Sequence, residues 1–192
     1  MNLLEQLAAH DHEQVIAFQN RAAGLRGFLA IHDTTLGPAL GGTRLWRYAT
    51  EEEALADALR LSRAMTYKAA LAELPYGGGK AVILDHLGLK RAEAFEAYGR
   101  LVGSLRGRFY TGTDVGVTPE DLAAAGRGSD DELLFHFGFQ DQFPFGFQLA
   151  GQVDNLLLSG DDLARADGAE HLHIFLEHLG GAGGHGLEEV VL

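Results

Sequence analysis

Residues 65–80 read Met-Thr-Tyr-Lys-Ala-Ala-Leu-Ala-Glu-Leu-Pro-Tyr-Gly-Gly-Gly-Lys, and they contain two lysines, Lys68 and Lys80, that are 12 residues apart. A lysine in a mostly apolar segment is costly to desolvate, so it needs either a charged partner or a function. The three glycines before Lys80 allow the backbone to approach a ligand and to turn its N–H groups toward an anion. This combination suits a small substrate that carries a carboxylate. The alternative is a glycine turn with two lysines whose charged ends reach solvent.

Two further segments complete a set of motifs. Residues 37–44 read Gly-Pro-Ala-Leu-Gly-Gly-Thr-Arg, and residues 111–116 read Thr-Gly-Thr-Asp-Val-Gly. Together with Met65–Lys68 and Gly77–Lys80, they follow the order and spacing of the amino-acid dehydrogenases. From about Gly24 to Arg127 the chain therefore resembles the N-terminal, substrate-binding domain of the leucine/phenylalanine/valine branch of the glutamate dehydrogenase superfamily.

The resemblance implies a role for each charged motif residue. Lys68 would bind the α-carboxylate of the substrate, helped by Gly41 and Gly42, since a flexible point charge suits a carboxylate. Lys80 would be the general acid/base that handles the attacking water and the imine. That role needs a lysine that titrates nearer neutrality than usual, and burial and the positive charge of Lys68 would both lower its pKa. Asp114 would shuttle a proton at the substrate amine.

The resemblance also indicates the class of substrate side chain. Glutamate-specific members carry a lysine just before the Gly-Gly pair, and this chain has Leu40 there. A glutamate side chain would be left buried and unpaired beside an aliphatic residue. We therefore predict a branched-chain or aromatic amino acid, or its 2-keto acid, as the ligand. The backbone of Gly77 and Gly78 would complete the anion-binding wall.

Composition limits the classes of partner. The 192 residues suffice for one hydrophobic core, or for one core with a small appendage. The formal net charge of −12 argues against nucleic acid and anionic membranes as partners, and no apolar run approaches the roughly 18 residues that span a bilayer. There is no cysteine, and residues 1–7 have no signal-peptide pattern. We expect a soluble, cytoplasmic protein.

Charge and aromatic content change near Arg127. Residues 1–127 hold 14 of the 15 basic and 15 of the 27 acidic residues, a net charge of −1. Residues 128–192 hold one basic and 12 acidic residues, a net charge of −11, and 7 of the 11 phenylalanines. We predict a substrate-binding and dimerisation domain over residues 1–127, followed by an atypical, acidic and phenylalanine-rich tail over residues 128–192.

The tail contains two patterns. Phenylalanines alternate at period 2 over residues 135–147, which predicts either a hairpin packed on the first domain or an aggregation-prone or unfolded segment. Residues 181–186 read Gly-Ala-Gly-Gly-His-Gly, formally the G-x-G-x-x-G pattern of dinucleotide-binding sites. Only six residues follow, so we interpret this segment as a flexible glycine-rich end.

Hydrophobic periodicity predicts alternating helices and strands in residues 1–127, and hence an α/β fold in which helices cover a sheet. Thr50 and Glu53 are expected to cap the second helix, and Pro119 to open the fourth. Helices are predicted at residues 4–17, 50–64, 91–105 and from 118, and strands at 27–32, 43–48, 81–84 and 108–111. The strand at 43–48 is expected beside that at 27–32, and the strand at 81–84 after a glycine loop.

No metal site is predicted, because His10 and His12 diverge on a helix, and the histidines at 171, 173 and 178 form no better set. The family reaction is the reversible, NAD(P)-dependent oxidative deamination of an amino acid to its 2-keto acid. Family members hold the cofactor on a following Rossmann domain of roughly 150 residues. Only 65 residues follow Arg127, so we expect no complete Rossmann domain and assign no cofactor-binding residue.

Two classes of function therefore stay open. The first is an oxidoreductase, or a subunit or fragment of one, with an intact substrate half. The second is a truncated, non-catalytic module that binds amino acids or keto acids or forms oligomers, or an inactive frameshift product. A homo-oligomer is expected in either case, because this domain carries the subunit contacts of the resembled family.

Overall fold

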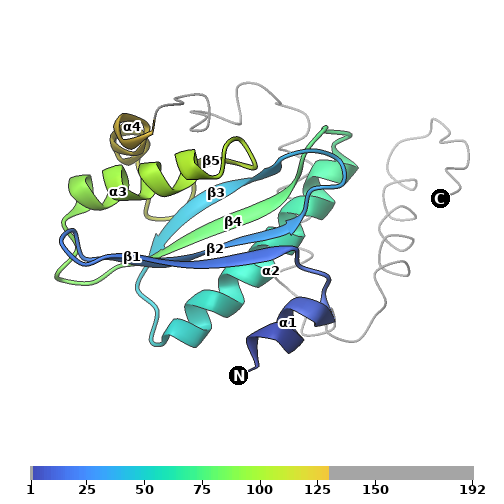
Figure 1. Cartoon of the computed structure of the whole chain (residues 1–192), viewed down its shortest axis with the longest axis horizontal. Coiled ribbons are helices and arrows are strands. Elements are labelled where there is room, and N and C mark those ends of the chain that lie inside the picture. The colour runs from blue at the N-terminus through green and yellow to red at the C-terminus, as the bar shows by residue number, and fades with distance from the viewer. Residues whose placement is uncertain (1, 130–192) are drawn as a thin grey trace, which may run out of the picture. The chain divides into compact units, whose positions relative to one another are not determined.

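The computed structural model describes residues 2–129 (Figure 1). The predicted hairpin at residues 135–147 and the glycine-rich end lie outside the described residues. In chain order the elements are α1 (Leu3–Ala9), β1 (Gln14–Asn20), β2 (Leu25–Asp33), β3 (Ala39–Trp46), α2 (Glu51–Leu71), β4 (Gly77–Leu84), α3 (Arg91–Ser104), β5 (Phe109–Thr113) and α4 (Pro119–Gly128). The strands form one five-stranded mixed sheet, and this confirms the predicted α/β fold.

The strand order is β1-β2-β4-β3-β5. β2 pairs antiparallel with β1 and β4, whereas β3 pairs parallel with β4 and β5. Parallel neighbours need a crossover connection, which α2 supplies between β3 and β4. The prediction that residues 43–48 lie beside residues 27–32 was wrong, because β4 is inserted between these two strands.

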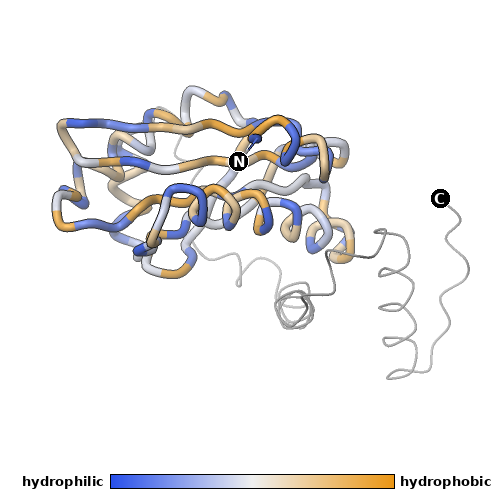
Figure 2. Tube along the Cα trace, turned by 90° about the horizontal axis from the view of Figure 1, so that it is seen from below, coloured by the Kyte–Doolittle hydropathy of each residue, from blue (hydrophilic) through white to orange (hydrophobic). Residues whose placement is uncertain are grey.

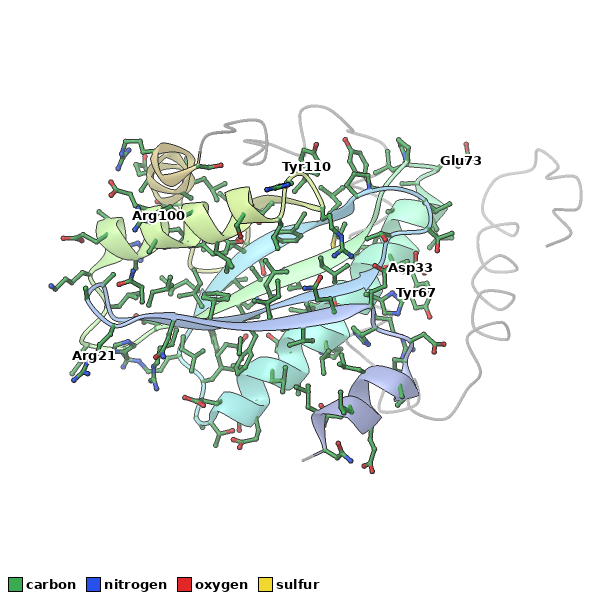
Figure 3. The ribbon with its side chains drawn as sticks, in the orientation of Figure 1. Arg21, Asp33, Tyr67, Glu73, Arg100 and Tyr110 are labelled. Atoms are coloured by element: carbon green, nitrogen blue, oxygen red, sulfur yellow. The ribbon has the colours of Figure 1, made fainter. Side chains whose placement is uncertain are left out.

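The helices cover the two faces of the sheet separately. α2 lies against one face, and α3 and α4 lie against the other (Figure 1). Hydrophobic residues follow one another along the strands (Figure 2), whereas Arg21, Glu73 and Arg100 are exposed at the periphery (Figure 3). None of the helices in this part of the chain is long and apolar enough to cross a membrane.

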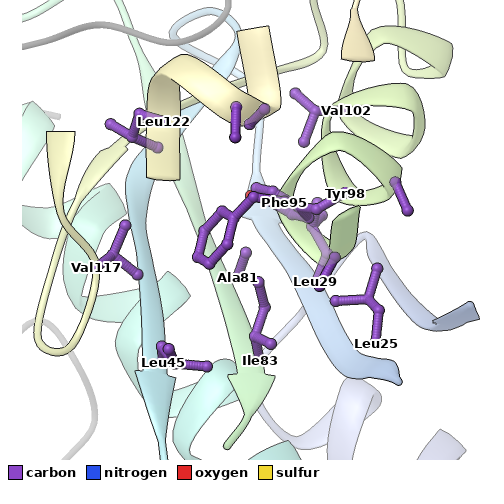
Figure 4. Packing of buried hydrophobic residues seen from close by; sticks show 14 of the residues in the cluster. Leu25, Leu29, Leu45, Ala81, Ile83, Phe95, Tyr98, Val102, Val117 and Leu122 are labelled. Carbon is purple, nitrogen blue, oxygen red and sulfur yellow. The ribbon is translucent and has the colours of Figure 1, made fainter. Parts of the chain in front are cut away.

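Each face has its own core. Beneath α3 and α4, the largest cluster includes the fully buried aromatic side chains of Phe95 and Tyr98 (Figure 4). The ring of Phe109 belongs to the same cluster and is also fully buried. Within it, the Tyr98 hydroxyl lies 2.6 Å from Thr43 Oγ1, which in turn lies 2.8 Å from Thr111 Oγ1. These hydroxyls satisfy one another in an apolar core and tie β3 to β5. Under α2 a smaller cluster contains Ala30, Ala54, Ala58, Leu59, Val82 and Leu84.

The structure confirms the predicted starts of α2 and α4. The side chain of Thr50 accepts a hydrogen bond from the Glu53 N–H and opens α2, but the Glu53 side chain accepts from the Ala49 N–H, so only half of the Thr50–Glu53 capping box forms. Pro119 is the first residue of α4, as predicted, and Thr118 and Asp121 add a reciprocal capping box that was not predicted. However, α2 continues to Leu71, beyond the predicted end near residue 64. Lys68 therefore lies in the last turn of a helix of 21 residues.

The helix predicted over residues 4–17 was wrong in its second half. α1 ends at Ala9, Asp11 has a positive φ of 53°, and residues 14–20 form strand β1. The apolar residues Val15, Ile16 and Phe18 also satisfy a strand, and their antiparallel pairing with β2 decides between the two structures. Short apolar segments of this kind fit both periodicities.

The glycines at 77–79 also differ from the prediction, because they begin strand β4 and form no turn or loop. A methyl group on Gly78 would overlap with the backbone nitrogen and hydroxyl of Thr66, on α2. On the opposite face, a methyl group on Gly79 would lie 2.7 Å from the ring of Phe109. These glycines therefore allow a helix and an aromatic ring to pack directly on the strand.

Candidate functional site

The structure brings together the two residues predicted to be catalytic, Lys80 and Asp114. Lys80 lies in β4, and Asp114 directly follows β5, so β3 separates their strands. Lys80 Nζ nevertheless lies 2.7 Å from Asp114 Oδ2. Gly42 of β3 makes this contact possible, because a Cβ atom there would lie 2.9 Å from the Cβ of Asp114. A glycine at this position leaves room for the carboxylate to reach across β3.

The ion pair lies on the face of the sheet that α2 covers. Side chains alternate along a strand, so Lys80 points to the same face as Gly78 and Val82, both of which pack against α2. The Lys80 side chain is 7% exposed and that of Asp114 is 22% exposed. An ammonium group at this depth needs a charged partner, and Asp114 supplies it.

Burial and neighbouring charges set the proton affinities of the pair. Burial lowers the pKa of Lys80, Asp114 partly opposes this effect, and the positive charges of Arg44 and Lys68 lower the pKa further. Burial by itself would raise the pKa of Asp114, but Lys80, Arg44 and the backbone N–H of Val115 hold it below its usual value. The site therefore combines an ionised carboxylate with an amine that releases its proton more readily than an ordinary lysine.

Lys68 is the third charged residue of the predicted site. It lies in the last turn of α2, is half-buried, and its charge is close enough to lower the pKa of Lys80. The two ammonium groups thus come from different elements, a helix and the strand beneath it. Their proximity concentrates positive charge, which favours an anionic ligand.

The remaining predicted positions lie on adjacent strands. Leu40, Gly41 and Gly42 belong to β3, and Gly77 and Gly78 begin β4, with Leu40 paired opposite Gly78. Leu40 is only 1% exposed. The N–H of Gly77 donates to the carbonyl of Pro38 at 2.9 Å, so it already has a partner within the protein.

Sequence reasoning missed a charged network that continues from the pair. Arg44 Nε donates to Asp114 Oδ2 at 2.9 Å, and Arg44 Nη1 donates to Asp57 Oδ2 at 2.8 Å. Asp57 lies on α2 and also accepts hydrogen bonds from the Tyr48 hydroxyl and from Arg60. The one feature of the sequence that could have indicated this network is Arg44, because it is a charged residue in a mostly apolar segment and ends the motif of residues 37–44.

The described residues do not fit a dinucleotide. None of the strand-to-helix turns between residues 2 and 129 carries the G-x-G-x-x-G pattern, and the triple glycine lies inside β4, flanked by β2 and β3. The same residues contain no group of three or more His, Asp or Glu side chains that could hold a metal ion.

Comparison with known proteins finds a family match over most of the described residues. Residues 12–128 match the Glu/Leu/Phe/Val dehydrogenase dimerisation domain, a range that extends the predicted resemblance to include β1. Phenylalanine dehydrogenase of Caldalkalibacillus thermarum is 56% identical over 134 residues, and leucine dehydrogenase of Geobacillus stearothermophilus is 53% identical over 123 residues. These matches cover 69% and 64% of this chain but only 35% and 34% of the two relatives.

The solved structures agree with this assignment. L-tryptophan dehydrogenase of Nostoc punctiforme gives a TM-score of 0.64 at 50% identity, over 66% of this chain and 38% of that protein. A hetero-hexameric glutamate dehydrogenase of Thermus thermophilus shares the fold, with a TM-score of 0.56 at 22% identity. The match over residues 12–128 spans more than half of the chain, and the chain therefore belongs to the Glu/Leu/Phe/Val dehydrogenase family.

Proposed function

We propose that this chain binds a small apolar 2-amino acid or 2-keto acid at Lys68, Lys80 and Asp114, and that it provides the substrate half of an amino-acid dehydrogenase. The observation that carries the proposal is the contact of 2.7 Å between Lys80 Nζ and Asp114 Oδ2, with the charge of Lys68 nearby. The reaction is the reversible oxidative deamination of an apolar L-amino acid, for which the family uses NAD(P).

Each residue has a proposed role that follows from its charge and burial. Lys68 attracts the substrate carboxylate, with Gly41, Gly42, Gly77 and Gly78 forming the adjacent backbone. Lys80 has a lowered pKa, so its amine can accept a proton from water and return it at Nζ. Asp114 stays ionised and can accept a proton from the substrate amine. Leu40, the buried aliphatic residue just before Gly41 and Gly42, provides no partner for a second carboxylate.

A second candidate function is favoured by the extent of the comparisons. The matched segment spans about a third of the length of the relatives, and the described residues do not fit a dinucleotide. A non-catalytic module that binds amino acids or keto acids or forms oligomers, or an inactive frameshift product, would also retain this domain. Turnover of an apolar amino acid by the purified chain with added NAD(P) would exclude the second candidate. Lack of turnover would fit both candidates, because a substrate half without a dinucleotide site does not complete the reaction by itself.

The proposed site can be tested by ligand binding. A 2-keto acid with a branched apolar side chain, 4-methyl-2-oxopentanoate, is titrated into the chain by calorimetry or ligand-observed NMR. Because a partly exposed ion pair contributes about 1 kcal/mol or less, we expect a dissociation constant of about millimolar. For the same reason, Lys68→Ala should weaken binding by about two- to fivefold.

Lys90→Ala is the matched control, because Lys90 is an exposed lysine at the start of α3. It should leave binding unchanged. Equal binding by the Lys68→Ala variant and the unchanged chain would refute the assignment of the carboxylate to Lys68. Discrimination against 2-oxoglutarate, which has a second carboxylate, tests the role of Leu40 in the same experiment.

A further inference from the structure

The network around Asp114 has one arrangement that the family assignment does not explain. A single carboxylate oxygen, Asp114 Oδ2, accepts both Lys80 Nζ at 2.7 Å and Arg44 Nε at 2.9 Å. The other end of the same guanidinium, Arg44 Nη1, donates to Asp57 Oδ2 at 2.8 Å. Arg44 therefore lies between two carboxylates, one beside the reactive amine and one on helix α2.

We propose that Arg44 is a positioning residue: by dividing its guanidinium between Asp114 and Asp57, it sets how tightly Asp114 holds the ammonium group of Lys80. The inference rests on the roles proposed above for Lys80 and Asp114 and adds two residues to that site. Arg44 acts on the lysine only through the carboxylate and through its own charge, and Asp57 acts through Arg44.

Arg44 changes the electrostatic cost of deprotonating Lys80. A buried lysine that pairs alone with a buried aspartate stays protonated, because loss of the proton would leave the carboxylate as an uncompensated buried charge. Arg44 removes this penalty, since a guanidinium keeps its proton at any physiological pH and remains bound to Asp114. With Lys80 neutral, Arg44 and Arg60 balance the charges of Asp57 and Asp114, so Lys80 can give up its proton without unbalancing the network.

The contact between Arg44 and Asp57 is largely shielded from solvent and is fixed by neighbouring side chains. The side chains of Arg44 and Asp57 are only 22% and 15% exposed, so solvent screens their contact less than that of a surface pair. Asp57 is itself fixed by the Tyr48 hydroxyl and by Arg60, which donates to the other carboxylate oxygen at 2.7 Å. Hydrogen bonds from three side chains hold its pKa below the usual value despite burial. Asp57 therefore stays ionised and competes continuously with Asp114 for Arg44.

The competing explanation is that Arg44 and Asp57 only join β3 to α2. The two explanations differ in what they predict for the proton affinity of Lys80. A purely structural link, once broken, would loosen the packing in the same way whichever partner is replaced. A divided guanidinium predicts shifts of opposite sign, because removing Arg44 and removing its competitor Asp57 change the Lys80–Asp114 contact in opposite directions.

The experiment measures the pKa of Lys80 directly, without ligand. The chain has only three lysines, Lys68, Lys80 and Lys90, so a sample with 13C at the lysine Cε gives three titrating signals. Lys→Arg variants assign these signals. We expect Arg44→Gln to raise the pKa of Lys80, because Asp114 then binds the ammonium group alone and a positive charge is lost. We expect Asp57→Asn to lower it, because Arg44 then binds Asp114 more fully.

Two further variants keep the test decisive if Arg44→Gln does not fold. Arg44→Lys retains a charge but offers its donors from a single nitrogen, whereas Arg44 contacts Asp114 through Nε and Asp57 through Nη1, so it should raise the pKa of Lys80 by less than Arg44→Gln does. Arg60→Gln removes a guanidinium that contacts Asp57 and not Asp114, and its effect should be the smallest of the set. Shifts of the same sign for Arg44→Gln and Asp57→Asn, or no shift for Arg44→Gln or Arg44→Lys, would overturn the proposal. Keto-acid binding by the Lys68→Ala variant tests the proposed function separately.

Discussion

Gly78 shows how closely a single residue can be constrained by its neighbours. Its Cα faces the backbone of α2, and an added methyl group would overlap with atoms of Thr66 and Ser62. We expect Gly78→Ala to destabilise the fold by about 1–3 kcal/mol or more, since the helix would have to move away from the sheet. Denaturant unfolding measures the change, and Lys68 on the same helix should then bind the keto acid less well.

Gly126 supplies the control for this substitution. It lies in α4, where an added methyl group would meet no heavy atom within 4 Å. Gly126→Ala should therefore raise the free energy of unfolding by about 0.5–1 kcal/mol, because alanine lowers the backbone entropy of the unfolded chain. If Gly78→Ala left stability as high as Gly126→Ala does, close packing would not be the reason for a glycine at position 78.

The charged residues of the site could be predicted from the sequence only in part. Lys68, Lys80 and Asp114 belong to motifs that can be recognised residue by residue. Asp57 belongs to none, and it meets Arg44 only because the pleat of β3 and the phase of α2 bring them to the same face. Such a contact depends on the packing of a helix on a strand, which spacing along the chain does not specify.

At the scale of elements, three histidines join the first helix and strand to the sheet and to α2. His12 Nε2 lies 2.9 Å from the carbonyl of Leu59, and its ring lies 4.8 Å from that of His32. His32 Nε2 donates to the carbonyl of His10 at 3.0 Å, so Nδ1 accepts from the Thr66 hydroxyl at 2.8 Å. That assignment is the one of the neutral ring; a protonated His32 could instead donate to the Thr66 hydroxyl, so it is burial, and not these hydrogen bonds, that favours the neutral form.

The histidine cluster predicts a stability that falls in acid. Burial lowers the pKa of His32 to about 4 from 6.5, and it also lowers the pKa of His10 and His12. The unfolded chain therefore binds more protons than the folded one between these two values. The contribution of the neutral histidines to the free energy of unfolding should be fully present above pH 6.5. It should be lost progressively as the pH falls toward about 4.

Urea unfolding at a series of pH values measures this decline. His32→Gln should make the free energy of unfolding depend less steeply on pH between about 6.5 and 4. The substitution should also lower stability at every pH, because the ring of His32 is packed in the interior. His86→Gln is the control, because His86 lies between β4 and α3, outside the cluster, where it contacts the carbonyl of Gly24. An equally steep decline in the His32→Gln variant would mean that other groups, such as His10, His12 or carboxylates, cause the loss of stability.

The elements that sequence reasoning placed correctly are those with capping residues or a single clear periodicity. α3 and α4 are examples, since each begins where polar residues precede an apolar repeat. Residues 14–20 and 77–79 were misjudged because their structure depends on partners elsewhere in the chain. β1 exists through its pairing with β2, and the glycines are strand residues because α2 and Phe109 pack on them.

At the scale of the whole molecule, the open edges of the sheet favour self-association and the negative net charge opposes it. β1 and β5 are the two edge strands, and each pairs with only one other strand among residues 2–129. Edge strands offer backbone donors and acceptors to a second chain. The family match is to a dimerisation domain, so we expect this chain to form a homodimer or a larger homo-oligomer at micromolar concentration.

Charge should make that association depend on salt. The chain carries a net charge of −12, of which −11 falls in residues 128–192, so two copies repel each other at long range. Added salt screens this repulsion beyond about 10 Å at 0.1 M, while contacts between apolar residues and strands persist. Light scattering over a concentration series should therefore show a larger mass at high than at low ionic strength. A mass that stays at that of one chain under both conditions would contradict the expected self-association. A mass that falls with salt would instead indicate that complementary charges hold the copies together.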